Sequence, residues 1–159
     1  MTTQEIYQAA AAIEGMAQDL YERLARRYEG EPWLRDLFAE LAHEEAQHAL
    51  RIRLLGRQAA QDPARFRVDV RAEADVATLA VDFAAMADEF ATSDFQGDLA
   101  ELLDRVSQME RRLSVLHADH LARDADDATR ALFQSMAQQD ARHLAMLEDA
   151  ARARGVPSR

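Results

Sequence analysis

Two segments of the sequence carry an acid and a histidine, three residues apart, inside an otherwise apolar stripe. Core-facing positions of a bundle helix recur in alternating steps of three and four residues. On that rule, the first stripe reads Leu34, Phe38, Leu41, Glu45, His48, Ile52 and Leu55. The second reads Thr129, Phe133, Met136, Asp140, His143, Leu147 and Ala150. A shift of 95 residues takes His48 to His143, so the sequence predicts two duplicated helices that face one core.

Two further stripes each place one glutamate among apolar residues. The stripe near the N-terminus reads Tyr7, Ala10, Glu14, Ala17, Tyr21, Leu24 and Tyr28. The other reads Leu99, Leu103, Val106, Glu110, Leu113, His117 and His120. Burying four carboxylates without partners would destabilise the fold by several kcal/mol each. Because the four stripes contain no arginine or lysine, protons or bound cations must balance the charge, and two divalent ions would neutralise four carboxylates.

Helix breakers divide the chain into helical segments with one long connection. The sequence holds only 5 Gly and 3 Pro, and we expect helices over about 3–28, 33–61, 75–91, 98–123 and 126–154. Residues 62–74 include Pro63 and are predicted to form an extended crossover. Two helix pairs with short loops, joined by a crossover that contains an extra helix, predict an all-α, ferritin-like four-helix bundle. One core suits this length, so we expect a single domain over residues 1–159.

Composition narrows the functional classes. The 19 basic and 29 acidic residues give a formal charge of −10, which disfavours nucleic acid as a partner. With 0 Cys, the chain has no thiolate for zinc, iron-sulfur or nucleophilic chemistry. No stretch approaches the roughly 20 apolar residues of a membrane span. The N-terminal residues do not read as a signal peptide, and we expect a cytoplasmic protein.

The spacing of the acids and histidines favours a two-metal site. Side chains three residues apart on a helix face the same way, so Glu45 with His48, and Asp140 with His143, can reach one cluster. Oxygen-rich ligation with one imidazole per metal suits iron or manganese better than structural zinc. We therefore expect two iron ions, with manganese or a mixed pair as the alternatives.

Other polar residues near the stripes have less specific signals. Tyr21 and His117 each follow an inward glutamate by seven residues and are candidates to hydrogen-bond the metal ligands, although both positions also suit plain core residues. Glu40 and His43 form a third acid and histidine pair, but they fall outside the stripe, and we expect them to be solvated.

These residues resemble the rubrerythrin family of di-iron carboxylate proteins. The resemblance is carried by Glu14-Gly15-Met16-Ala17-Gln18-Asp19-Leu20-Tyr21 and by Leu37-Phe38-Ala39-Glu40-Leu41-Ala42-His43-Glu44-Glu45-Ala46-Gln47-His48. It implies a metal ligand set of Glu14, Glu45, His48, Glu110, Asp140 and His143. In that set Glu45 and Asp140 would bridge the two metals. The implied activity is reduction of hydrogen peroxide or dioxygen with oxidation of Fe(II), in iron handling or oxidative-stress defence.

The chain departs from the family pattern in three ways. Without cysteine it cannot hold the rubredoxin-like iron that relays electrons, so turnover would need an external electron donor. Asp140 stands where glutamate is usual, which shortens the reach of this bridging carboxylate by one methylene. Leu113 stands where the family has a further glutamate, and its absence brings the site closer to a symmetric ferroxidase centre. A non-catalytic iron-binding or carrier protein and a metal-free helical interaction bundle are the alternative interpretations. The family resemblance also predicts a homodimer.

Overall fold

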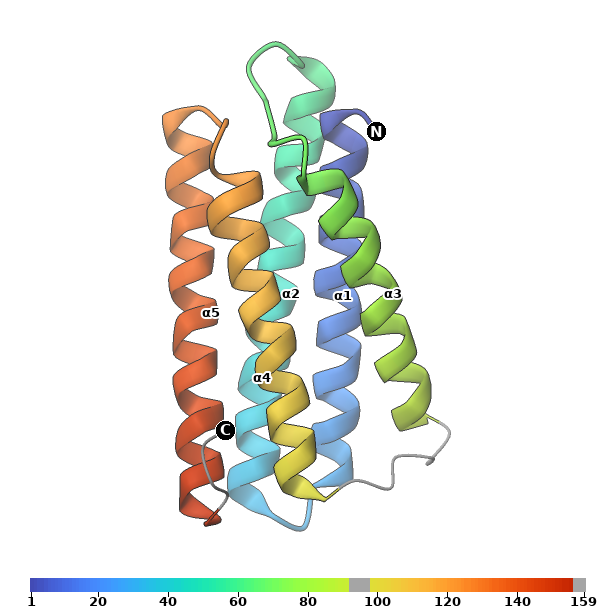
Figure 1. Cartoon of the computed structure of the whole chain (residues 1–159), viewed down its shortest axis with the longest axis vertical. Coiled ribbons are helices and arrows are strands. Elements are labelled where there is room, and N and C mark those ends of the chain that lie inside the picture. The colour runs from blue at the N-terminus through green and yellow to red at the C-terminus, as the bar shows by residue number, and fades with distance from the viewer. Residues whose placement is uncertain (92–97, 156–159) are drawn as a thin grey trace.

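Helices make up almost all of the structure, a computed structural model that describes residues 1–91 and 98–155 (Figure 1). They are α1 (Thr3–Arg27), α2 (Pro32–Gln61), α3 (Ala72–Ala91), α4 (Leu99–Val115), the π-helix η1 (Leu116–Leu121) and α5 (Asp127–Ala153). The predicted all-α fold is confirmed, and these described residues contain no strand. The helix predicted from residue 75 begins earlier, at Ala72. The single domain predicted over 1–159 includes residues 92–97 and 156–159, which lie outside the described part.

Local sequence explains where the bundle helices begin. At the start of α1, the Thr2 hydroxyl accepts from the backbone N–H of Glu5, and the Glu5 carboxylate accepts from the N–H of Thr2. The Asp98 and Asp126 carboxylates accept backbone N–H groups in the first turns of α4 and α5. Such caps satisfy amide groups that have no partner inside the helix. Helix α2 begins instead at Pro32, whose fixed backbone suits a first turn.

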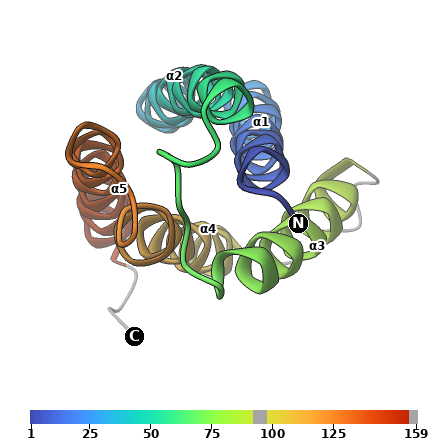
Figure 2. The same ribbon diagram turned by 90° about the horizontal axis from the view of Figure 1, so that it is seen from above.

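Four helices, α1, α2, α4 and α5, surround a common core, and α3 lies outside it (Figure 2). Helix α3 packs against α1 and is tied to α4 by ion pairs between Arg105 and Glu89 and between Arg112 and Asp82. It returns the chain along the length of the bundle, so that α4 runs parallel to α2 (Figure 1). This connection confirms the predicted long crossover and the ferritin-like topology.

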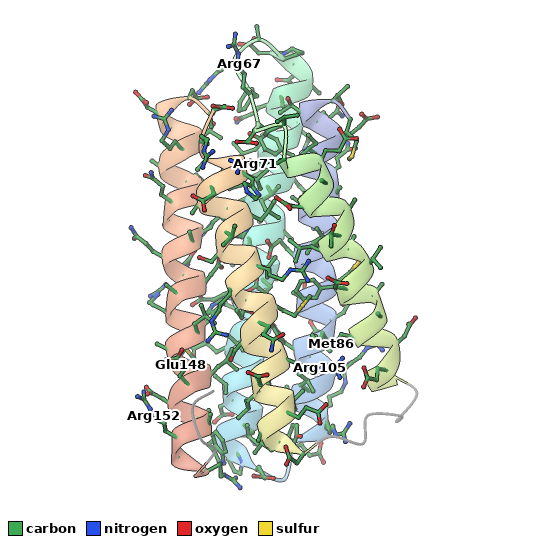
Figure 3. All side chains as sticks on the ribbon, viewed as in Figure 1. Arg67, Arg71, Met86, Arg105, Glu148 and Arg152 are labelled. Atoms are coloured by element: carbon green, nitrogen blue, oxygen red, sulfur yellow. The ribbon has the colours of Figure 1, made fainter. Side chains whose placement is uncertain are left out.

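The predicted stripes supply most of the core. Aromatic rings stack between helices, with Tyr21 and Phe38 separated by 6.4 Å between centroids. Tyr28 and Leu99 are only partly buried, because they lie at helix ends. Charged side chains such as Glu148 and Arg152 of α5 stand on the outside (Figure 3). None of the helices in the described ranges is both long and apolar enough to cross a membrane.

The predicted helix over 98–123 is not one continuous α-helix, because it changes to the π-helix η1 at Leu116. The N–H of Ala122 donates to the carbonyl of His117, five residues earlier, at 3.1 Å. Single π-turns in helices are frequent at functional sites. Here His117 is fully buried and faces the bundle centre, whereas His120 contacts Asp75 of α3. The sequence had placed both histidines in one stripe.

Candidate metal centre

Six acid and imidazole side chains from α1, α2, α4 and α5 converge inside the bundle. Each residue has at most 1% of its surface exposed: Glu14, Glu45, His48, Glu110, Asp140 and His143. Their candidate ligand atoms form two overlapping groups, each within 4.8 Å. One group is Glu14, Glu45 and His48, and the other is Glu45, Glu110, Asp140 and His143. The structure therefore brings together every residue predicted as a metal ligand, while metal binding itself stays a prediction.

Glu45 and Asp140 each reach both halves of this cluster. One turn along α2, His48 Nδ1 lies 3.1 Å from Glu45 Oε2, and His143 Nδ1 of α5 lies 3.2 Å from Glu45 Oε1. From α5, Asp140 Oδ1 lies 3.7 Å from His48 Nδ1. A helical spacing of three residues puts each acid beside its own histidine in sequence, and the antiparallel packing of the helices brings in the other. This is the placement that bridging carboxylates require.

The crowded carboxylates differ in how readily they ionise. Burial, and then the charge of Glu45, raises the pKa of Glu14 well above its usual range and the pKa of Glu110 to about 7. Burial also opposes ionisation of Glu45, but interactions with Glu14, His143 and His48 outweigh it and lower the pKa of Glu45. Burial lowers the pKa of an imidazole, yet hydrogen bonds with Glu110 and Glu45 raise the pKa of His143 to about 11. Protons held by Glu14, Glu110 and His143 thus reduce the negative charge of the cluster, which has no arginine or lysine beside it in the stripes.

Two partly exposed residues hold the far sides of the histidine rings. Glu44 Oε2 lies 2.9 Å from His143 Nε2, and Gln139 Oε1 lies 3.0 Å from His48 Nε2. Each partner comes from the helix opposite its histidine. Sequence reasoning missed both residues, although the shift of 95 takes Glu44 to Gln139 and each one directly precedes a predicted ligand. Contacts of this kind orient a metal-binding imidazole and fix its tautomer.

Tyr21 and His117 contact the terminal carboxylates. The Tyr21 hydroxyl donates a hydrogen bond to Glu110 Oε1, and both side chains are fully buried. Burial and the charge of Glu110 raise the pKa of Tyr21 well above its usual range, so the phenol stays protonated. His117 Nδ1 is hydrogen-bonded to Asp140 Oδ2 at 2.8 Å, and its Nε2 lies 2.8 Å from Glu14 Oε1. Both residues lie where the sequence placed them, beside the predicted ligands.

Comparison with known protein families shows to which family the chain belongs. A family model described as rubrerythrin matches residues 5–151, which include nearly all of the four bundle helices and all six candidate ligands. The chain belongs to the rubrerythrin family. Neither the curated proteins nor the solved structures that were searched gave a match. The resemblance expected from the sequence is therefore confirmed, and membership of the rubrerythrin family together with the buried cluster supports a di-iron protein.

The donor atoms of this rubrerythrin-family chain fit a pair of cations. Within the described residues, several buried polar atoms of the cluster make no hydrogen bond of good geometry: both carboxylate oxygens of Glu14, Glu45 Oε1, Asp140 Oδ1 and His117 Nε2, although His117 Nε2 lies 2.8 Å from Glu14 Oε1. An unsatisfied buried acceptor destabilises a fold by roughly 1–3 kcal/mol. Carboxylate and imidazole lone pairs that converge in this way can serve as metal ligands, and this donor set suits iron or manganese.

Residues next to the cluster show which side chains do not belong to it. The pair of Glu40 and His43 is exposed on α2, so the interpretation of this third acid and histidine pair as solvated was correct. Leu113, where rubrerythrins have a further glutamate, is fully buried one turn after Glu110. The buried cluster therefore holds four carboxylates rather than five.

Proposed function

We propose that this chain is a di-iron oxidoreductase that reduces hydrogen peroxide or dioxygen while Fe(II) is oxidised. The observation that carries the proposal is the convergence of six buried donors from four helices into two overlapping ligand groups. Membership of the rubrerythrin family supports it. A role in iron handling or oxidative-stress defence follows from that chemistry.

The residues divide naturally between two metal positions. Position I would be held by Glu14 and His48, and position II by Glu110 and His143. Glu45 would bridge the two, and Asp140 would do so from the other side of the cluster. A bound ferrous pair would supply Lewis acidity and two electrons, which with two protons reduce one hydrogen peroxide to two waters.

The chain itself contributes positioning, exclusion of water and proton donors. The ligands are buried, so bulk water is kept from the centre. The Tyr21 hydroxyl is hydrogen-bonded to Glu110, where it is placed to relay a proton at the cluster. Electrons for repeated turnover must come from an external donor, since the chain has 0 Cys to hold a relay iron of its own.

Rapid mixing tests the proposal. The protein is loaded anaerobically with two equivalents of Fe(II) and mixed with hydrogen peroxide or with oxygenated buffer in a stopped-flow instrument. We expect oxidation faster than that of free Fe(II), and the ratio of the two rates identifies the preferred oxidant. Glu45→Ala should remove the acceleration, whereas Glu40→Ala, an exposed acid on the same helix, should keep it. Oxidation no faster than that of free Fe(II), with both oxidants, would contradict the enzymatic proposal.

An iron-binding or carrier function is the second candidate, and Leu113 favours it. The buried leucine leaves the site without the extra carboxylate that the family pattern supplies, so the ligands have fewer ways to rearrange between redox states. A carrier should oxidise iron once and retain it. Sustained peroxide consumption with a supplied reductant would instead identify the enzyme.

A further inference from the structure

The two metal positions of the proposed centre are related by the internal repeat, but their surroundings differ. The shift of 95 takes His48 to His143, and a shift of 96 takes Glu14 to Glu110. A symmetric site would repeat the outer contacts as well. Comparing the contacts behind each imidazole and each terminal carboxylate therefore shows whether the positions are equivalent.

Behind the imidazoles, one position has a carboxylate and the other an amide. His143 of position II contacts the Glu44 carboxylate at 2.9 Å, whereas His48 of position I contacts the Gln139 carbonyl oxygen at 3.0 Å. Arg51 donates to that same oxygen at 2.9 Å, which draws electron density away from it. A carboxylate partner raises the basicity of a histidine ligand, and mutation of such a partner typically lowers metal affinity 10–100-fold. Position II is favoured by this difference.

Arg142 offsets the charge of Glu44 only weakly. Its guanidinium lies 3.9 Å from Glu44 Oε2, and 67% of the Arg142 side chain is exposed to solvent. Exposed ion pairs of this kind are strongly screened by water and salt. The carboxylate behind His143 therefore keeps most of its effect on the imidazole.

The terminal carboxylates of the two positions also have different neighbours. Tyr21 occupies one oxygen of Glu110, and the second oxygen lies 3.1 Å from His143. On the other side, His117 Nε2 lies 2.8 Å from Glu14 Oε1, so this imidazole competes with a metal for the terminal carboxylate of position I. The candidate donors around position II number four within 4.8 Å, against three around position I.

We propose that the two metal positions are inequivalent and that position II, between Glu110 and His143, binds metal first and more tightly. Position I, between Glu14 and His48, binds second and exchanges its metal more readily. The inference rests on the proposed metal centre, which it deepens. Glu44, Gln139 and His117 act as positioning residues that set the order.

Titration with Co(II) under nitrogen, followed by calorimetry and visible absorption, tests the order of binding. We expect two steps whose dissociation constants differ about 10–100-fold. Glu14→Gln should remove the weaker step and keep the tighter one, and Glu110→Gln should do the reverse. Two indistinguishable steps, or loss of the tighter step in Glu14→Gln, would overturn the inference and leave the proposed function intact. Absence of Co(II) and Fe(II) binding would overturn both.

Variants of the outer residues test the cause of the asymmetry. Gln139→Glu should strengthen the weaker step, and Glu44→Gln should weaken the tighter one, so each should bring the two constants about 10-fold closer. Gln138→Glu and Glu40→Gln make the same charge changes at exposed neighbouring positions and should leave the ratio unchanged. Circular dichroism checks that each variant is folded. If the control variants at Gln138 and Glu40 changed the ratio as much as the variants at Gln139 and Glu44, net charge rather than contact with the histidines would set the affinities.

Discussion

Carboxylates at the centre of the bundle and carboxylates between α3 and α4 are neutralised in different ways. On α3, Asp82 and Glu89 are partly exposed, and each pairs with an arginine of α4. At the centre, Glu14 and Glu110 are fully buried, and the core stripes supply no basic side chain. The fold thus satisfies its outer acids by itself, whereas its inner acids depend on protons or on cations from solution.

Metal removal should have the largest effect on stability, and this effect should depend on the carboxylates at the centre rather than on those between α3 and α4. A ligand present at a hundred times its dissociation constant stabilises a protein by about 2.7 kcal/mol, so two metals should contribute roughly 5 kcal/mol. For a chain of this size that raises the unfolding temperature by roughly 10–20 °C. Glu45→Ala should abolish most of the increase and lower the metal content below two per chain, measured by calorimetry and elemental analysis.

The matched control for this variant is Asp82→Ala, which removes a carboxylate from the outer region. It should keep both the metal content and the increase in unfolding temperature, because Asp82 pairs with Arg112 and lies outside the cluster. Unfolding temperatures that do not respond to Fe(II), Mn(II) or Co(II) in the wild type would contradict the distinction between the two regions.

The stability of the protein in chelator should fall as pH rises from about 5 to about 9. Folded Glu110 keeps its proton to about pH 7 against a usual pKa of 4.5, and folded His143 keeps its proton to about pH 11 against 6.5. Between pH 4.5 and about 7 for Glu110, and between pH 6.5 and about 11 for His143, the folded chain binds more protons than the unfolded chain. The free energy of unfolding therefore decreases as pH rises.

Bound metal should reverse this trend, because it displaces the same protons and binds more tightly as pH rises. Denaturant unfolding at pH 5, 7 and 9, with and without metal, measures both slopes. A chelated protein that becomes more stable over that range would show that the raised pKa values of Glu110 and His143 do not govern its stability.

Tyr21→Phe should lower the free energy of unfolding by a smaller amount, through the hydrogen bond to Glu110 at the centre. Removing the hydroxyl takes away the donor to the buried Glu110 Oε1 and leaves only the contact of Oε2 with His143, and the expected loss is about 1–3 kcal/mol in the free energy of unfolding. Tyr28→Phe is the matched control, because Tyr28 is only partly buried at the end of α1, and its loss should stay within about 0.5 kcal/mol. Equal losses in the two variants would remove the special role of the Tyr21 hydrogen bond.

Arg112→Ala should have the smallest effect. The ion pair with Asp82 is partly exposed, with 39% and 43% of the two side chains accessible, and such pairs contribute about 0–1 kcal/mol. Metal content should not change. A loss of several kcal/mol would mean that the outer region is held by its charges as strongly as the centre is.

Helical periodicity is the reason that the fold and the six ligands could be predicted from the sequence. An acid or a histidine that interrupts an apolar stripe must be buried, and Glu45 and His48 are. Glu44 and Gln139 lie beside the stripes, where the same periodicity describes a solvated surface, so it gave no indication of their role. The repeat could have paired these two residues with each other, but not with the histidine of the opposite helix.

The sequence by itself determined which residues form helices, which faces are buried and that four carboxylates share one core without a basic partner. Only the tertiary structure decided that His117 faces the centre while His120 turns to Asp75, and that His143 and His48 receive different partners. The physical reason is that periodicity fixes the direction of a side chain on its own helix. Distances between helices depend instead on their rotation and axial shift, and here also on a π-turn that changes the register of η1.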